Sequence, residues 1–299
     1  MSGPGGWQCV RSFSGESGEQ LMKPHISVCI PVYQGASTLA ATLRSVLASD
    51  RAEFEVVIRD NGSTDGTSDV ISGFDDPRIR LIRSEETLPL PANWRATVEQ
   101  ARGELIKVVC ADDLIHPDCL ATQAALLEDP SLALVACRRD FIDGNGRLLT
   151  RNAGLPKLLG RRGVSEVARA AVRFGINPVG EPACVMFRRR DYDAIGGFDG
   201  SNVFAMDIDA WLRILTRGDM FGQPEAHAAF RMWTESFSNS HNRQQLGEHL
   251  RFLKQVANNP RYEIPAVLRH LAPAAAHVSW RAWTVRQWLW SRRSTAKAG

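Results

Sequence analysis

The chain lacks the sequence signatures of several large protein classes. No apolar run approaches the roughly 20 residues that a membrane-spanning helix needs, and segment 1–20 has no apolar signal core. No G-x-x-x-x-G-K-[ST] occurs, which counts against a P-loop nucleotide hydrolase. No G-x-G-x-x-G follows the first apolar run, which counts against a dinucleotide site. The formal charge of +3 is too small to imply nucleic acid as a partner.

The cysteines also lack the paired spacing of a metal cluster. Several of them fall inside apolar runs that predict strands. We therefore expect buried, reduced thiols and a cytoplasmic protein. The six are Cys9, Cys29, Cys110, Cys119, Cys137 and Cys184.

What is present is an alternation of strand and helix patterns in a chain of globular composition, 44% hydrophobic and 23% charged. It predicts an α/β fold with a mainly parallel sheet and helices on both faces. We expect a Gly/Ser-rich disordered leader (1–24), a catalytic domain (25–240) and a helical C-terminal appendage (241–299). Predicted strands are 26–32, 54–60, 79–82, 105–110, 132–141, 183–187 and 228–233; predicted helices include 66–74, 92–102 and 207–216.

Two of the predicted strands end in carboxylates. Asp60 closes the second strand and opens a dense turn cluster, and Asp112 and Asp113 follow the fourth. In open α/β sheets, ligands bind beyond the carboxyl ends of the strands. Lys107, inside the fourth strand, is expected to be a solvated flank.

Several segments taken together carry a resemblance to a known family. They are Ile26–Tyr33, Asp60–Asp65, Cys110–Asp113, Gly196–Asp199 and Asp207–Arg213. In this order they resemble a family 2 glycosyltransferase of the Rossmann-like GT-A fold, over about residues 24–240. The resemblance implies inverting transfer of a sugar from a nucleoside diphosphate sugar to a hydroxyl of a glycan or lipid-linked acceptor. Surface polysaccharide or glycolipid biosynthesis would be the setting.

The resemblance assigns the nucleotide to the first two strand ends. Asp60 would accept a hydrogen bond from the imide N–H of uracil or thymine, which favours a UDP- or dTDP-sugar. Its alternative is an Asx-turn that bonds its own loop. Pro31, Val32 and Tyr33 would form the nucleoside shelf, with strand packing as the competing role for Val32.

By the same resemblance, Asp113 would bind Mg²⁺ or Mn²⁺. Asp112 would contact the ribose or the outer shell of the metal. Cys110 stands where many relatives have an acid, so one carboxylate is missing. The alternative for both acids is a pair of solvated loop carboxylates.

Asp207 is the expected general base, at the start of a helix, although Met206 stands where many relatives have Glu. A helix N-cap is its alternative role. Asp209 would point elsewhere.

Four further residues are candidate substrate contacts. Glu181 would bind sugar hydroxyls or lie in a surface turn, and Arg231 would meet pyrophosphate or pair with an acid. Trp233, where relatives often have His, would stack on a sugar or base. Asn93 would lie near the donor.

The C-terminus is rich in tryptophan and arginine. Four of the eight tryptophans lie within 280–290, interleaved with arginines. Segment 280–293 predicts either peripheral contact at the inner face of a membrane or helix packing, on the catalytic domain or on a second subunit.

Two other functions compete with the transferase. A catalytically degenerate relative would bind sugar nucleotide or protein without turnover; Cys110 and Trp233 favour it, whereas Asp60, Asp113 and Asp207 oppose it. A sugar nucleotidyltransferase usually begins with a Gly-rich basic phosphate loop, which is absent here.

Overall fold

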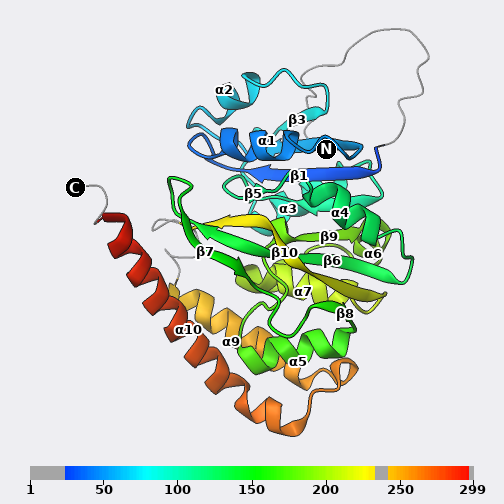
Figure 1. The fold of residues 1–299 in the computed structure, drawn as a ribbon, viewed down its shortest axis with the longest axis vertical. Helices are drawn as coiled ribbons and strands as arrows, with labels where there is room; N and C mark the ends of the chain where they lie inside the picture. The colour runs from blue at the N-terminus through cyan, green and yellow to red at the C-terminus, as the bar shows by residue number, and fades with distance from the viewer. Residues whose placement is uncertain (1–23, 233–241, 296–299) are drawn as a thin grey trace, which may run out of the picture.

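The computed structural model of the chain describes residues 24–232 and 242–295 (Figure 1). Ten strands form one sheet in the order β3-β2-β1-β4-β9-β6-β10-β5, with β7 paired to β6 and β8 paired to β10. Helix α3 packs on β1 and β2, α4 on β6 and β10, and α7 on β6. The predicted α/β class, a mainly parallel sheet with helices on both faces, is confirmed.

The strands are β1 (Ile26–Val32), β2 (Phe54–Asp60), β3 (Ile79–Arg83), β4 (Leu105–Val108), β5 (Leu114–Ile115), β6 (Leu132–Ile142), β7 (Leu148–Ala153), β8 (Gly160–Arg162), β9 (Val185–Arg188) and β10 (Asp219–Arg231). The helices are α1 (Leu39–Leu47), α2 (Thr67–Ser72), α3 (Leu90–Glu99), α4 (Cys119–Leu126), α5 (Val164–Phe174), α6 (Arg189–Ala194), α7 (Met206–Ile214), α9 (Asn242–Asn258) and α10 (Ala266–Thr295).

The parallel half of the sheet brings the predicted strand ends together. β1 pairs in parallel with β2 and β4, and the register sets Val32 opposite Asp60. Every residue of β1 and β2 is buried, as expected for strands covered on both faces. Their β-branched runs suit this environment, and the loops that leave them meet at one edge.

The structure differs from the expected elements in several places, and it adds α5, which was not expected. β10 begins at Asp219, nine residues before the expected start. The sequence pattern does not indicate a strand here, because the segment contains Gly222 and Pro224 and is interrupted by bulges. The predicted strand 183–187 begins as a 3₁₀ turn, Pro182–Cys184. α3 starts at Leu90, so that Pro91 lies inside its first turn, where proline is tolerated.

The prediction of a solvated Lys107 is wrong. β4 lies inside the sheet between β1 and β9, so this side chain is fully buried. Its Nζ donates a hydrogen bond of 2.8 Å to Oε1 of Gln123 on α4. A buried ammonium needs such a partner.

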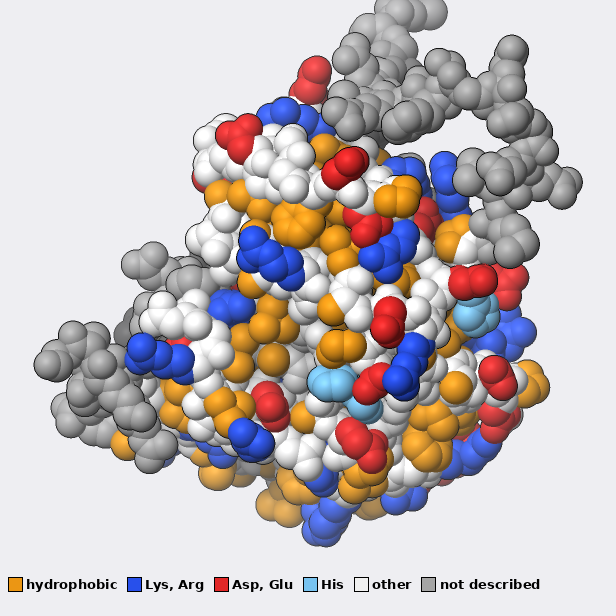
Figure 2. Space-filling model, turned by 45° about the horizontal axis from the view of Figure 1, so that its top comes forward, with side chains coloured by type: hydrophobic (Ala, Val, Ile, Leu, Met, Phe, Trp, Pro, Cys, Tyr) orange, Lys and Arg blue, Asp and Glu red, His pale blue; other side chains and the backbone are white. Residues whose placement is uncertain are grey.

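The C-terminal part is helical, and α10 packs against α5 and α9 at the lower left of the molecule (Figure 1). No described helix combines the length and hydropathy needed to cross a bilayer. On the face drawn in Figure 2, basic and acidic side chains are interspersed. The expected leader lies almost entirely outside the described residues.

Candidate functional site

The loops that follow β1 and β2 are hydrogen-bonded to each other. The backbone N–H of Gln34 donates to Ser63 Oγ (2.9 Å) and that of Gly35 donates to Thr67 Oγ1 (2.9 Å). The next N–H, of Ala36, donates to a carboxylate oxygen of Asp65 (3.0 Å). A side chain at position 35 would collide with Val32, since its Cβ would lie 2.5 Å from Val32 Cγ2. This edge of the sheet is therefore a preorganised double loop.

Asp60 lies at the base of this double loop and is almost inaccessible, with 1% of its side chain exposed. Its Oδ1 accepts from the Ser63 N–H (2.9 Å), and its Oδ2 accepts from Ser68 Oγ (3.1 Å). These are the contacts of the turn-forming alternative. A carboxylate has further lone pairs, so the base-reading role stays a prediction.

The predicted nucleoside shelf divides into two parts. Pro31 and Val32 are buried in the sheet, whereas Tyr33 is 52% exposed at the start of the loop that follows β1. Only Tyr33 therefore offers a free aromatic face to a base. The side chain of Val32 packs inside the sheet, and its carbonyl accepts the Asn61 N–H (2.9 Å); contact of Pro31 and Val32 with a nucleoside stays a prediction.

Asn93 is directed toward the protein interior. Its Oδ1 accepts from Nη1 of the buried Arg59 (2.6 Å), which also donates to Oδ1 of Asn61 (2.8 Å). Burial lowers the pKa of Arg59. Asn93 thus supports the Asp60 turn from below, and its contact with a donor stays a prediction.

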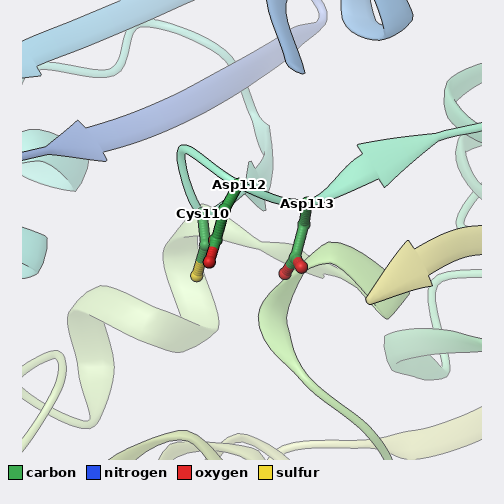
Figure 3. Close-up of side chains that lie close together, drawn as sticks. All are labelled: Cys110, Asp112 and Asp113. Atoms are coloured by element: carbon green, nitrogen blue, oxygen red, sulfur yellow. The ribbon is translucent and has the colours of Figure 1, made fainter. Parts of the chain in front are cut away.

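Three candidate metal ligands project to the same side of the loop after β4 (Figure 3). One ligand atom from each of Cys110, Asp112 and Asp113 lies within 4.8 Å of the others. Asp113 is fully buried; its Oδ1 accepts the Arg231 N–H (3.2 Å), while Oδ2 has no hydrogen-bond partner in the described part of the chain. An unpaired buried carboxylate oxygen is unfavourable, and a hard divalent cation would satisfy it.

The thiol is a poor member of this ligand set. Burial raises the pKa of Cys110, and the charges of Asp113 and Asp112 raise it further. Burial also raises the pKa of Asp113, with the neighbouring Asp112 adding to the effect. A protonated thiol is a weak ligand for Mg²⁺ or Mn²⁺, so the residues present fit a cation held by carboxylates.

Arg231 braces this loop through the backbone. Its Nε donates to the Asp112 carbonyl (2.9 Å), and its Nη1 donates to the carbonyls of Asp143 (3.2 Å) and Gly144 (3.1 Å). It is buried, which favours a structural role over free contact with pyrophosphate. Trp233 lies outside the described residues.

Asp207 lies in the first turn of α7, after Ala205 in the N-cap position. Its Oδ1 accepts the Ile208 N–H (2.7 Å), and its Oδ2 accepts from Nδ2 of Asn177 (2.8 Å). Burial raises the pKa of Asp207 to about 6, and the charge of Glu181 adds to the rise. Asp209 pairs instead with Arg213 (2.7 Å).

Glu181 enters the same site from the loop before β9. Its carboxylate pairs with Nε of Arg139 on β6 at 2.5 Å. Glu181 and Asp207 both raise the pKa of the Cys110 thiol, so both carboxylates lie near the candidate metal loop. Four acids from three segments of the chain therefore converge, which is an arrangement suited to cations and sugar hydroxyls.

The sequence reasoning missed two residues of this site. Asn177 donates to Asp207, and its Oδ1 accepts the N–H groups of Val179 and Gly180 (3.0 Å each). Arg139 is buried and neutralises Glu181. The only sequence signal was the polar turn around Pro178, and it does not indicate what either side chain contacts.

Comparison with known proteins identifies the family. The family model "Glycosyl transferase family 2" matches residues 27–196. An uncharacterised protein of Mycobacterium tuberculosis, MT1568, is 36% identical over 201 residues, which is 65% of this chain and 63% of that protein. An uncharacterised protein of Sinorhizobium fredii is 29% identical over 65% of this chain but 23% of its own length. The match thus spans less than two thirds of both relatives.

Two proteins of Bacillus subtilis that are named as putative glycosyltransferases are also similar to this chain. The putative glycosyltransferase EpsE of Bacillus subtilis is 28% identical over 65% of this chain and 68% of its own. The putative teichuronic acid biosynthesis glycosyltransferase TuaG of the same organism is 25% identical, over 73% and 83%.

Solved structures share the fold. TarS of S. aureus with UDP-GlcNAc superposes with a TM-score of 0.61 at 17% identity, over 84% of this chain and 71% of that one. The mannosyltransferase PcManGT of Pyrobaculum calidifontis with GDP-Man and Mn²⁺ gives 0.61 at 18% identity, over 93% and 82%. With the family match, the strand-end acids and this shared architecture, the chain belongs to glycosyl transferase family 2.

Proposed function

We propose that the chain transfers a sugar from a nucleoside diphosphate sugar to a hydroxyl acceptor, with inversion at the anomeric carbon. The observation that carries this proposal is the convergence of Asp207, a carboxylate of raised pKa, with the unpaired buried oxygen of Asp113. The nucleotide sugars in the complexes of TarS and PcManGT support the donor class.

Asp113 and Asp112 would hold Mg²⁺ or Mn²⁺, and the Mn²⁺ in the PcManGT complex supports this choice. Such an ion supplies positive charge that stabilises the leaving diphosphate. Arg231 would keep the loop in place, because it hydrogen-bonds the Asp112 carbonyl and the Asp113 carboxylate. The protonated Cys110 thiol would remain outside the ligand set.

Asp207 would take the proton of the acceptor hydroxyl. A pKa of about 6 leaves this carboxylate ionised at neutral pH yet more basic than an ordinary aspartate, which is the range that suits a general base. Asn177 would orient it by hydrogen-bonding Oδ2, leaving the remaining lone pairs for the acceptor. Glu181, held by Arg139, would accept hydrogen bonds from sugar hydroxyls.

The nucleoside would lie against the exposed ring of Tyr33, next to the Asp60 turn. Asp60 keeps spare lone pairs for an imide N–H, so we propose a UDP- or dTDP-sugar as donor. For the acceptor, we propose a glycan or lipid-linked glycan of a surface polysaccharide pathway, on the cytoplasmic side. The polysaccharide pathway named for TuaG supports this setting.

A second candidate is a protein that binds sugar nucleotide without turnover. Cys110 favours it, because the metal loop has one carboxylate fewer than in many relatives. The raised pKa of Asp207 opposes it, because simple binding does not need a basic carboxylate.

A nucleotide screen followed by a turnover assay tests both candidates. Thermal unfolding would be measured with UDP, dTDP and GDP, each with and without Mn²⁺, and then donor hydrolysis or transfer with the matching sugars. We expect UDP or dTDP to stabilise the protein only with Mn²⁺, by about 3 kcal/mol at a hundredfold excess over Kd. Binding without turnover on any acceptor would favour the second candidate; the absence of nucleotide binding would refute both.

A further inference from the structure

The inner face of α10 is held to the body of the protein. Ser279 Oγ donates to the carbonyl of Phe174 (2.5 Å), at the end of α5. The Trp283 and Trp290 rings both contact Phe141 of β6, with centroids 5.7 and 5.4 Å away, and Trp290 is only 7% exposed. These two tryptophans pack on the sheet, so they are not free to anchor in a membrane.

The helices approach closely where α5 ends. Gly175 has a positive φ of 61°, and a Cβ there would lie 2.4 Å from the backbone nitrogen of Ala276. Only glycine allows this contact, which fixes the rotation of α10 about its axis. A different face of the same helix is consequently turned outward.

That outward face carries a continuous aliphatic stripe. Its large members are Val267 (66% exposed), Leu271 (54%), Val278 (67%), Val285 (56%) and Leu289 (48%). They are five of the eight exposed large hydrophobic residues in the described part of the chain. The exposed Ala274 and Ala282 continue the stripe between them. An apolar patch of this kind commonly marks an interaction surface.

The spacing of the stripe favours a flat partner over a second helix. From Val267 to Leu289 the stripe advances 22 residues in six steps of four or three, or about 3.7 residues per turn. A left-handed coiled coil needs 3.5, and a strict heptad through Val267 would place Arg281 in the seam. The period of the stripe is instead close to the 3.6 residues per turn of an α-helix that is not supercoiled, as on a helix that lies on a plane.

The charges around the stripe have one sign. No acidic residue follows Glu263, whereas Arg281 and Arg286 are exposed on α10, and Arg292 and Arg293 follow in the sequence. Two copies docked through this face would oppose arginine to arginine. An anionic surface complements it, because arginines beside a buried apolar face are attracted to acidic headgroups.

We propose that the aliphatic stripe of α10 binds the surface of a bilayer that contains anionic phospholipid. The helix would lie in the plane of the headgroups, with the stripe inserted and the arginines at phosphate level. The surface is next to the candidate active site, since Trp290 contacts Phe141, and the hairpin that follows β6 bonds Arg231. The inference rests on the exposed face alone and holds whatever the transferred sugar is.

Vesicle co-sedimentation of the full chain tests the proposal. The probes would be vesicles of phosphatidylcholine alone and of phosphatidylcholine with phosphatidylglycerol at 7:3, at low salt and at 0.5 M salt. We expect sedimentation only with the anionic vesicles, weakened by salt because attraction between exposed charges is screened. Failure to bind anionic vesicles at low salt would overturn the proposal.

Two variants with matched controls assign the binding to this face. Leu271→Gln/Val278→Gln/Val285→Gln should reduce the fraction bound about tenfold or more, whereas His277→Gln/Thr284→Gln, exposed elsewhere on α10, should not. Arg281→Gln/Arg286→Gln should remove most of the salt dependence, but Arg44→Gln/Arg102→Gln on the catalytic domain should preserve it. The substituted side chains are exposed, so folding should be retained and can be checked by thermal unfolding.

The outcomes separate this proposal from the proposed function. Nucleotide binding and transfer to a water-soluble acceptor should be unchanged in the stripe variant. If the stripe variant bound anionic vesicles as well as the unaltered protein does, the proposal would be overturned. Light scattering that shows a dimer which the stripe variant disrupts would also overturn it, because the face would then join two copies.

Discussion

Replacing Asp207 with asparagine removes the proposed base at nearly constant volume. An amide cannot take the acceptor proton, so transfer should fall by about 10²- to 10⁴-fold, the usual contribution of a general base. UDP binding should persist, because the Asp60 and Asp113 loops do not depend on this side chain. The matched control is Asp209→Asn, two residues along α7, where the carboxylate pairs with Arg213.

The pH dependence gives a second measure of the same group. With a pKa of about 6, Asp207 would be about 10% ionised at pH 5, so the rate should be about tenfold lower there than at pH 8. An aspartate with the ordinary pKa of 3.8 would remain ionised at pH 5 and show no such loss.

Protein stability should change in the opposite direction to activity. The rise from 3.8 to about 6 corresponds to about 3 kcal/mol. Because the folded protein binds this proton more tightly than the unfolded chain, the stabilisation is complete below pH 3.8 and is lost as pH rises through about 6. Asp207→Asn should lack this part of the pH dependence. The new amide also faces the amide nitrogen of Asn177, which lowers the free energy of unfolding by about 1–3 kcal/mol. This loss does not depend on pH.

The assays are initial rates of sugar transfer from pH 5 to 8, UDP-induced thermal shifts, and chemical unfolding at pH 4 and 7 for the unaltered protein and both variants. Transfer by Asp207→Asn within tenfold of the unaltered rate would refute the base assignment. An equal loss in Asp209→Asn would show that the effect comes from the helix rather than from the carboxylate.

Two further predictions concern the groups around this base. Asn177→Ala removes a hydrogen bond that lowers the pKa of Asp207. The acidic limb of the pH–rate profile should therefore move to higher pH and kcat should fall, while KM for the donor changes little. An acidic limb at the same pH as in the unaltered protein would contradict the positioning role of Asn177. Asp113→Asn should abolish the Mn²⁺-dependent part of the stabilisation by UDP, about 3 kcal/mol at a hundredfold excess over Kd. The melting temperature of the free protein should not fall, because burial already raises the pKa of this acid. If calorimetry shows that UDP binding still depends on Mn²⁺, Asp113 is excluded as a ligand.

The first half of the fold was predictable from the sequence because its signals are local. A buried parallel strand is a short β-branched run, and its end is marked by a carboxylate or a turn cluster, as at Asp60 and Asp113. β10 was less predictable, since its bulges interrupt the two-residue period that identifies a strand. The predicted exposure of Lys107 was wrong because the burial of a polar strand residue depends on which strands lie beside it in the sheet.

The sequence by itself determined the α/β class, the family and the identity of the strand-end acids, because the order of elements and the residue types at their ends are properties of short segments. Only the tertiary structure decided the partners of those acids. Asn177 meets Asp207 across 30 residues, and Arg139 meets Glu181 from another strand.

The tertiary structure also decided which face of α10 is exposed. The sequence predicts a helix rich in tryptophan and arginine, but the close contact at Gly175 and the packing on Phe141 turn tryptophans inward and the aliphatic stripe outward. Such pairings depend on three-dimensional approach, which no short segment encodes.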